Sequence, residues 1–422
     1  GQSAKGLSVL LEYVSANPTG PLHVGHGRWA VIGDVIARML KAVGAKVETE
    51  FYVNNVGKQV KLLFESVKAV QAGKPVPEGG YGGDYIKDVA QGKFKNVDQL
   101  IDLFIKKQKQ TLDSLDVKFD NWFYENKLHD NKLIPKAIDR LKKLNRTFEE
   151  KGALWFKSEE MGDDKNRVLI REDGQPTYFA ADIAYHFEKY NRGFDKLINI
   201  WGTDHHGYVN RLKAAMTALD LPPEKLEIII GQLVTLYRGN EPIRMSKRTG
   251  EMVTLREVID EIGKDATRFF FAATDVNSHL DFDLELAKKK SHENPVFYVQ
   301  YAHARICSIL KKSQFPHPPS PSPTGRGGEE GVRADLSSLT EPSERDLIFK
   351  LMTWPDVVAE AARLRHPHRI TEYGKELGAV FHSFYEKCRV LGNPARLVLV
   401  DASRITLRNV LQLLGISAPE SM

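Results

Sequence analysis

Three short segments of this chain combine residue types that could bind and activate a nucleotide. The first is His23-Val24-Gly25-His26, followed by Gly27. Two imidazoles at a strand–helix turn, together with backbone N–H groups and the helix dipole, attract phosphate oxygens, and Gly25 and Gly27 allow a base or sugar to approach the backbone. Two ordinary capping or surface histidines are the alternative. The position directly after the first expected strand favours the phosphate site.

The second segment is Arg244-Met245-Ser246-Lys247-Arg248. The glycines and proline around it predict a mobile loop. Three cations on such a loop could close over a triphosphate and stabilise the charge of a transition state. A solvated basic turn is the alternative, and the segment alone favours that alternative.

The third segment, Trp201 to Gly207, also follows an expected strand. Gly202 would permit close approach by adenosine, and Asp204 could accept hydrogen bonds from ribose hydroxyls. The neighbouring His205 and His206 suggest a metal pair, but adjacent residues leaving a strand point apart and no third ligand is evident. We therefore expect no metal site.

The elements that must position these segments follow an α/β pattern. Residues 7–14 and 47–53 read as strands, and the helix between them has one apolar face from Ile32 to Val43, which makes a right-handed βαβ unit. Residues 58–165 read as a mainly helical insertion. A second α/β section follows, with strands at 167–171, 196–201 and 226–236 and helices at 178–190 and 207–218. We predict a split, doubly wound, Rossmann-like parallel sheet.

The last third of the chain reads as an all-α helix bundle. We expect helices at 295–312, 344–366, 370–390 and 401–414, and a disordered linker at 315–342, whose Pro, Ser and Gly content cannot bury a core. The predicted division is therefore 1–57 and 166–290 for the catalytic domain, 58–165 for the insertion, and 291–422 for the helical domain.

Composition narrows the class of protein. The 422 residues include 60 basic and 55 acidic side chains, a mild excess that permits a nucleic-acid partner. Two cysteines without CxxC spacing exclude a disulfide framework and a cysteine-rich zinc site and favour a reducing cytoplasm. No apolar run approaches the roughly 20 residues that span a bilayer, so we expect no membrane partner.

HVGH followed far downstream by RMSKR on a split α/β sheet resembles the class I aminoacyl-tRNA synthetases. Longer stretches are similar to arginyl-tRNA synthetases in particular. These stretches are LEYVSANPTGPLHVGHGR from Leu11, YGGDYI at Tyr81–Ile86, TYFAADIAYH at Thr177–His186, WGTDHHGYV at Trp201–Val209, and YVQYAHAR and FHSFYEKCRVL in the tail. Two departures stand in the basic loop, where Arg244 replaces Lys and Arg248 replaces Ser of the class pattern.

The resemblance implies roles for individual residues. The implied catalytic residues are His23, His26 and Lys247, which would hold the ATP phosphates. Further ATP contacts would come from Gly25, Gly27, Gly202, Asp204, Met245 and Ser246. The implied arginine pocket comprises Glu12, Asn17, Tyr178, Asp182 and His205. The spacing agrees, because Tyr178 and Asp182 are i and i+4 on one helix face, and two carboxylates suit a planar guanidinium.

The implied activity is ATP-dependent activation of L-arginine and its transfer to tRNA, with Mg²⁺ accompanying ATP and the helical tail holding the anticodon. The resemblance further implies that tRNA must be bound for activation, that the family's N-terminal domain is missing here, and that the protein is a monomer. A small-molecule nucleotidylyltransferase and a non-catalytic tRNA-binding paralogue are the alternatives, and lysine or glutamine is the alternative amino acid.

Overall fold

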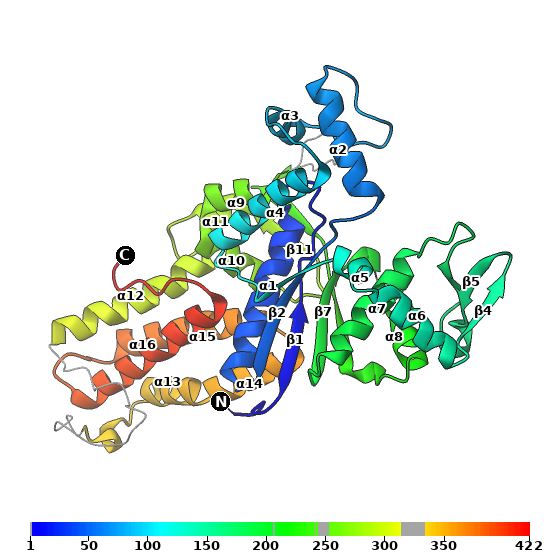
Figure 1. Ribbon diagram of the computed structural model, residues 1–422. Helices are drawn as coiled ribbons and strands as arrows, with labels where there is room; N and C mark the ends of the chain where they lie inside the picture. The colour runs from blue at the N-terminus through cyan, green and yellow to red at the C-terminus, as the bar shows by residue number, and fades with distance from the viewer. Residues whose placement is uncertain (1, 206, 240, 244–252, 314–333) are drawn as a thin grey trace.

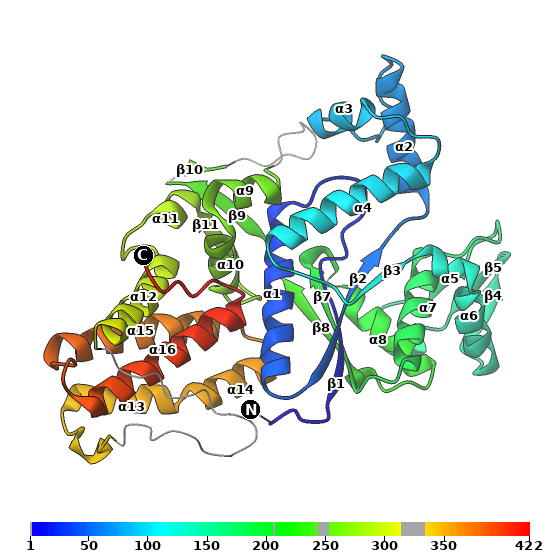
Figure 2. The same ribbon diagram turned by 60° about the vertical axis from the view of Figure 1, so that its left-hand side comes forward.

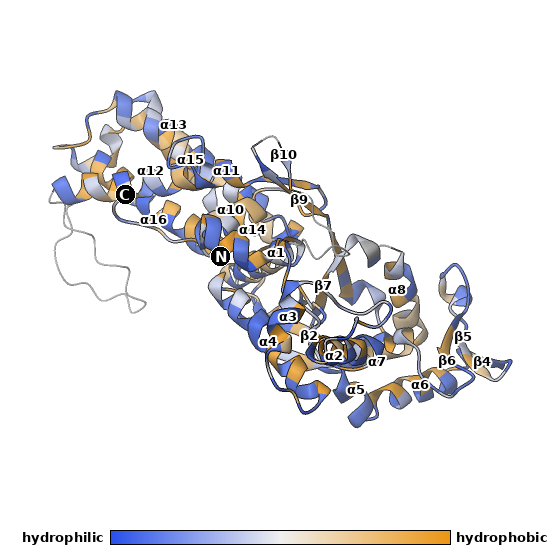
Figure 3. Cartoon of the chain, turned by 90° about the horizontal axis from the view of Figure 1, so that it is seen from above, coloured by the Kyte–Doolittle hydropathy of each residue, from blue (hydrophilic) through white to orange (hydrophobic). Residues whose placement is uncertain are grey.

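The computed structural model describes residues 2–205, 207–239, 241–243, 253–313 and 334–422. A parallel sheet stands at its centre (Figure 1). Seen from above, the helical domain and a small antiparallel sheet lie at opposite ends of the molecule (Figure 3).

The central sheet has five strands in the order β3-β2-β1-β7-β8. The strands are β1 Ser8–Glu12, β2 Lys46–Val53, β3 Asn121–Tyr124, β7 Lys196–Gly202 and β8 Leu226–Gly231. All neighbouring strands in it run parallel. The chain winds outward from β1 to β3 and later from β7 to β8, so the strand order reverses between β1 and β7. This topology confirms the predicted doubly wound fold.

Helices cover both faces of this sheet (Figures 1 and 2). Side chains alternate along each strand, so Val9 and Leu11 join one apolar cluster and Leu10 joins another. The first cluster includes α1 Val24–Ala42, α9 Leu255–Ile262 and α10 Lys264–Ala272. The second includes α6 Leu133–Lys143, α7 Tyr178–Asn191 and α8 Tyr208–Ala218. Glu12 is two residues from Leu10 along β1, so both side chains lie on the face of the sheet that α7 covers.

The predicted insertion contains strands that the sequence pattern did not show. Its helices are α2 Lys58–Gln71, α3 Asp84–Ala90, α4 Val97–Ser114 and α5 Asn126–Asp130, besides α6. β3, however, lies within it and pairs with β2 in the central sheet. β4 Thr147–Glu150 and β5 Ala153–Phe156 form an antiparallel pair.

Two predicted strands were placed wrongly. β6 Arg167–Ile170 pairs antiparallel with β5 and not with the central sheet. The predicted strand 226–236 is two strands, β8 and β9 Val234–Arg238, in different sheets. β9 pairs with β10 Glu241–Pro242 and with β11 Leu280–Asp283, which leads into α11 Leu284–Lys288. Strand periodicity shows that a segment is extended but does not show its partner.

The C-terminal part is helical, as predicted. Its helices are α12 Pro295–Ser313, α13 Pro342–Met352, α14 Trp354–Leu364, α15 His368–Lys387 and α16 Pro394–Leu414. The predicted helix 344–366 is two helices, and the second has Pro355 in its first turn, where the missing N–H is tolerated. Residues 314–333 lie outside the described residues. The remainder of the predicted disordered linker is ordered, because it holds the turn Leu336–Ser338 and the start of α13.

Both cysteines, Cys307 and Cys388, are free thiols. Among the described helices, none combines the length and apolarity that crossing a bilayer requires.

A buried arginine joins the helical domain to helices that pack on the central sheet. Arg268 of α10 is fully buried. Its guanidinium donates to the carbonyl of Leu414 at 2.7 Å and to that of Leu115 at 2.7 Å, and it forms an ion pair with Asp34 of α1. Gly415 ends α16 with φ +67°, and a Cβ there would lie 2.3 Å from the Arg268 guanidinium. One side chain therefore holds α1, α10 and the ends of α4 and α16 together.

We expect Arg268→Met to lower the free energy of unfolding by about 3–5 kcal/mol, because it leaves a buried carboxylate and two carbonyls without their partner. Urea denaturation followed by circular dichroism measures the change. Arg256→Met is the matched control, since Arg256 pairs with Asp260 on the exposed face of α9, and its denaturation midpoint should stay at the wild-type value. Equal midpoints for both variants would contradict the role of Arg268.

Candidate active site

A polar cavity opens where the strand order reverses, between the carboxyl ends of β1 and β7. Its volume is about 610 Å³. Ligands bind to doubly wound sheets at this switch point because the two adjoining loops diverge there. The predicted residues that line this switch-point cavity are Glu12, Asn17, His23, Gly25, His26, Asp182, Gly202 and His205.

Three polar side chains lie side by side across the sheet below the cavity. The register pairs Glu12 of β1 with Glu50 of β2 on one side and with Asn199 of β7 on the other. All three are buried. This polar row, Glu50-Glu12-Asn199, would destabilise the fold unless each member is paired, because burying a charge without a partner is costly.

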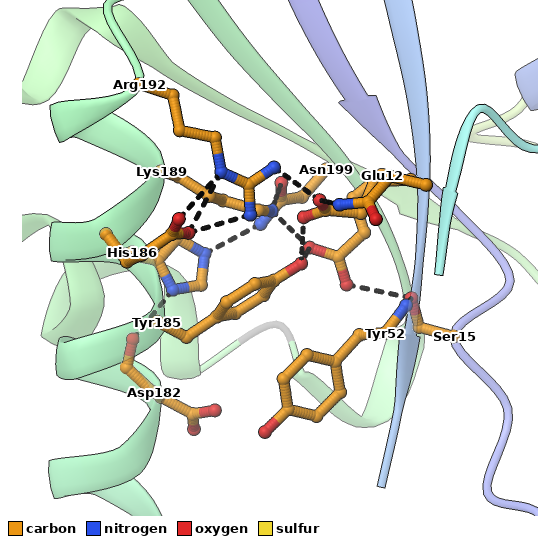
Figure 4. Close-up of polar contacts among 12 residues, drawn as sticks. Glu12, Ser15, Tyr52, Asp182, Tyr185, His186, Lys189, Arg192 and Asn199 are labelled. Carbon is orange, nitrogen blue, oxygen red and sulfur yellow. Dashed lines mark hydrogen bonds and ion pairs between the residues drawn. The ribbon is translucent and has the colours of Figure 1, made fainter. Parts of the chain in front are cut away.

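Helix α7 supplies the partners of the polar row (Figure 4). The Lys189 ammonium, itself fully buried, forms an ion pair with Glu12 and donates to Asn199 at 3.0 Å. Arg192 forms an ion pair with Glu50. The Tyr185 hydroxyl lies within hydrogen-bonding distance of both carboxylates. The two acids of the row are therefore neutralised by two cations one helical turn apart.

The same network fixes the protonation of His186. Its Nε2 accepts from the Asn199 amide at 2.8 Å, and its Nδ1 donates to the carbonyl of Asp182 at 2.8 Å. Burial, assisted by the positive charge of Lys189, lowers the pKa of His186 to about 3. His186 therefore stays neutral, and its two hydrogen bonds connect β7 with the turn of α7 that carries Asp182.

Asp182 differs from the acids of the polar row. No cation among the described residues forms an ion pair with it, and its carboxylate accepts a hydrogen bond from the Tyr208 hydroxyl. Burial raises the pKa of Asp182 to about 6. The hydrogen bond from Tyr208 lowers this pKa, whereas the negative charge of Glu12 raises it. A carboxylate in this state gains a cationic partner readily.

The turn after β1 is strained. Val14 and Ser15 adopt φ values of +68° and +41°, a region that β-branched residues rarely occupy. The Ser15 hydroxyl donates to Glu12 at 2.8 Å and accepts from the N–H of Tyr52 at 3.1 Å. Strain held by surrounding bonds is common at ligand sites, and here it directs the exposed Asn17 to the cavity rim.

The HVGH segment caps α1. The Nδ1 of His23 accepts from the backbone N–H of Gly25 at 3.1 Å and of His26 at 3.4 Å, and the Nδ1 of His26 accepts from the N–H of His23 at 3.3 Å. Since both Nδ1 atoms accept, each neutral ring carries its proton on Nε2 and is a donor there. Capping of α1 was the alternative role for these two histidines. It is compatible with phosphate binding, because the capping hydrogen bonds orient the Nε2–H donors of both rings.

The start of α9 lies beside these histidines. Thr254, the N-cap of α9, forms an antiparallel bridge with His23, and the Leu255 N–H donates to the Leu22 carbonyl at 2.8 Å. Residues 244–252 lie outside the described residues, and with them the predicted Met245, Ser246 and Lys247. The side chain of Asp204 lies outside them as well.

Two predicted site residues do not line the cavity. Tyr178 begins α7, and its side chain is 57% exposed. Gly27 faces the protein interior, where a Cβ would lie 2.3 Å from Leu255 and 2.9 Å from Phe271. Its missing side chain allows α1 to pack closely on α9 and α10.

Sequence reasoning missed the residues that support the site. Asp182, Tyr185 and Lys189 follow a spacing of three and four and share one face of α7. Lys189 stands on a face that is otherwise buried. A lysine on the inward stripe of an amphipathic helix is the signal that could have revealed it, because such a lysine is almost never buried without a partner acid.

Comparison with known proteins agrees with this geometry. The family described as tRNA synthetases class I (R), catalytic domain, matches residues 2–78 and 84–281, and the DALR anticodon binding domain matches residues 299–422. Fold, switch-point cavity and capped HVGH turn therefore define a class I aminoacyl-tRNA synthetase.

The similar proteins identify one family within this class. The chain is 47% identical to the arginine–tRNA ligases of Heliobacterium modesticaldum and Moorella thermoacetica, over 99% and 100% of this chain and 78% of each relative. The structure of Thermus thermophilus arginyl-tRNA synthetase superposes with a TM-score of 0.80 at 25% identity, covering 99% of this chain and 83% of that one. The chain belongs to the arginyl-tRNA synthetase family, and it is a ligase that joins arginine to tRNA.

We expect the carboxyl of Asp182 to titrate with a pKa of about 6 in the ligand-free protein. Tyr208→Phe should raise this pKa further, because it removes the hydrogen bond that stabilises the charged form. Carbon-13 NMR of labelled aspartate carboxyls, with Asp182→Asn for assignment, measures both values. A wild-type pKa near the ordinary value for aspartate would contradict the described environment.

Proposed function

We propose that the switch-point cavity holds the guanidinium of L-arginine against Asp182, with the ATP phosphates over His23 and His26. The observation that carries this proposal is the charge balance of the cavity. Two carboxylates line its described part, and one of them, Glu12, is already neutralised by Lys189. Asp182 supplies the remaining negative charge.

This charge balance favours arginine over the alternative amino acids. A guanidinium brings one positive charge and five donors in a plane, which Asp182 and the remaining acceptor sites of Glu12 can share. Glutamine would leave Asp182 without a cation, and lysine would bring a compact ammonium that cannot form a bidentate pair. Asn17 at the rim and His205 on the opposite side, both lining the cavity, would contact the amino-acid backbone.

The nucleotide side rests on α1. The N-terminus of this helix and the Nε2–H donors of His23 and His26 would receive phosphate oxygens, and Gly25 and Gly202 leave room for the nucleotide. Lys247 would reach the transferring phosphate from the loop that ends beside His23. The described cavity residues contain no group of three metal ligands, so Mg²⁺, which prefers oxygen ligands, would be held through the ATP phosphates.

The proposed reaction has two displacements. An oxygen of the arginine carboxylate attacks the α-phosphorus, the bond to the β-phosphate oxygen breaks, and pyrophosphate leaves. The terminal ribose hydroxyl of tRNA then attacks the activated carbonyl, loses its proton, and AMP leaves. Neither step needs a covalent protein nucleophile, so positioning and charge neutralisation supply the catalysis.

The tRNA would lie along the helical domain, residues 291–422, where the anticodon-binding family matches. We place the enzyme, as a monomer, in the cytoplasm, where tRNA charging serves translation and where its two free thiols are stable. The nucleotidylyltransferase alternative does not account for the helical domain, and a paralogue without activity does not account for an intact cavity.

We expect arginine together with tRNA to support ATP–pyrophosphate exchange, and arginine alone not to support it. Each of arginine, lysine and glutamine is assayed with and without total tRNA. Lys247→Ala, which should lower the exchange rate by about 10²–10³-fold, controls for contaminating synthetase. Exchange that requires lysine or glutamine instead would contradict the pocket assignment, whereas exchange without tRNA would contradict only the coupling to tRNA.

We expect Asp182→Asn to raise the KM for arginine and to reduce the preference for arginine over citrulline. Citrulline is nearly isosteric but neutral, so discrimination against it depends on the charge of Asp182. The ratio of kcat/KM for the two amino acids measures this preference. Asp260→Asn, an exposed acid on α9, is the control. An unchanged ratio in a folded Asp182→Asn protein would remove Asp182 from the pocket.

A further inference from the structure

Three side chains from two domains converge away from the switch-point cavity. Asp275 lies in the segment between α10 and β11, and His366 and His368 lie at the corner between α14 and α15. The Asp275 Oδ2 is 3.7 Å from the Nε2 of His366 and 3.5 Å from the Nδ1 of His368. The three ligand atoms all lie within 4.8 Å of one another. We call this group the Asp-His-His cluster.

The carboxylate of the cluster is held in one orientation. Its Oδ1 accepts from the backbone N–H of Asn277 at 2.8 Å and from the Asn277 amide at 3.0 Å. Its Oδ2 therefore faces the two imidazoles. The Asp275 carbonyl also accepts from the fully buried guanidinium of Arg28 at 2.8 Å. Backbone and side chain of Asp275 are both fixed before any ligand arrives.

The two histidines are held as firmly. Arg365 ends α14 with φ +60°, the His366 N–H donates to the Ala361 carbonyl at 3.0 Å, and Pro367 restricts the backbone between the histidines. The Nδ1 of His368 is buried and has no hydrogen-bond partner among the described residues. A buried nitrogen that faces a carboxylate without a hydrogen bond is placed to bind something that both can share.

We propose that Asp275, His366 and His368 bind a zinc ion. Zinc binds nitrogen and carboxylate oxygen at about 2.0–2.2 Å in a tetrahedron, which separates the ligand atoms by roughly 3.3–3.5 Å. The two measured separations from Oδ2 are close to this value. Two imidazoles and one carboxylate suit zinc and similar transition metals, whereas magnesium and calcium prefer oxygen ligands.

The ion would fasten the helical domain to the catalytic domain. The catalytic-domain family matches up to residue 281, and the anticodon-binding family begins at residue 299, so Asp275 and the two histidines belong to different domains. Arg28 extends the link, because its guanidinium also donates to the carbonyls of Gln232 and Leu233 at 3.1 and 3.3 Å, and Leu233 lines the switch-point cavity. Zinc would thus stabilise the contact that orients the tRNA-binding helices toward the site.

Calorimetric titration of the chelator-treated full chain with Zn²⁺ alone tests this proposal. Asp275→Asn and His366→Gln, which preserve size, should each bind one zinc equivalent fewer than the wild-type chain. Zinc should raise the thermal midpoint of the wild-type chain and leave that of the two variants unchanged. Mg²⁺ should have no effect on the midpoint of any of them. His279→Gln is the matched control, since the exposed side chain of His279 contacts an acid, Asp281, at 3.4 Å, and this variant should bind as much zinc as the wild type.

The wild-type measurement decides the matter even where a variant folds poorly. A wild-type chain that binds no zinc overturns the proposal. Zinc binding that is equal in the wild-type chain and in either folded variant also overturns it, because the ion then binds at other histidines. Loss in the two cluster variants, with retention in His279→Gln, supports the site.

Discussion

The ion pair between Lys189 and Glu12 is the constraint on which the active site depends. Glu12 stands in the middle of a parallel sheet, between Glu50 and Asn199, where an unpaired carboxylate would cost several kcal/mol. Lys189 can reach it only if α7 lies directly over the carboxyl ends of β1 and β7. That requirement fixes the height and rotation of α7, and so places Asp182, which lies two turns earlier on the same helix face, at the cavity. The buried polar row therefore fixes the position of α7 relative to the sheet.

The charge pattern of the cavity follows from the same pair. The two acids of the polar row are neutralised by cations of α7, Glu12 by Lys189 and Glu50 by Arg192. The acid left over, Asp182, carries a raised pKa of about 6 because burial opposes its ionisation. An amino acid whose side chain is a cation relieves this cost, whereas a neutral side chain does not. In the proposed site, selection of arginine rests on Asp182, which has no cationic partner among the described residues.

Much of the fold could be predicted from the sequence, because periodicity is local. The βαβ start and the helical tail appeared where apolar spacing predicted them. The errors concern which strands pair and where one helix ends. β6 joins the outer sheet, β3 joins the central one, and the helix predicted at 344–366 divides just before Pro355. The site followed the same rule. HVGH and Asp182 could be named from motifs, but the burial of Lys189 and the packing role of Gly27 depend on contacts between segments far apart in the chain.

Helix α1 connects catalysis with the tRNA-binding part. Its first turn carries His23 and His26, its second turn carries Arg28, which holds Asp275, and Asp34 further along receives the guanidinium of Arg268 from α10. The proposed phosphate-binding turn and contacts with the helical domain therefore lie on one continuous helix. A requirement for tRNA in the activation of arginine would have a physical basis in this connection.

The most direct test of the central claim is the number of protons released when arginine binds. Calorimetry of the chain with saturating tRNA, at pH 6 in buffers of different ionisation enthalpy, gives this number. Because Asp182 is half-protonated near its pKa and must ionise to hold the guanidinium, we predict release of about half a proton per arginine. The release should vanish in Asp182→Asn. Binding of arginine to the wild-type chain without any proton release would contradict the account.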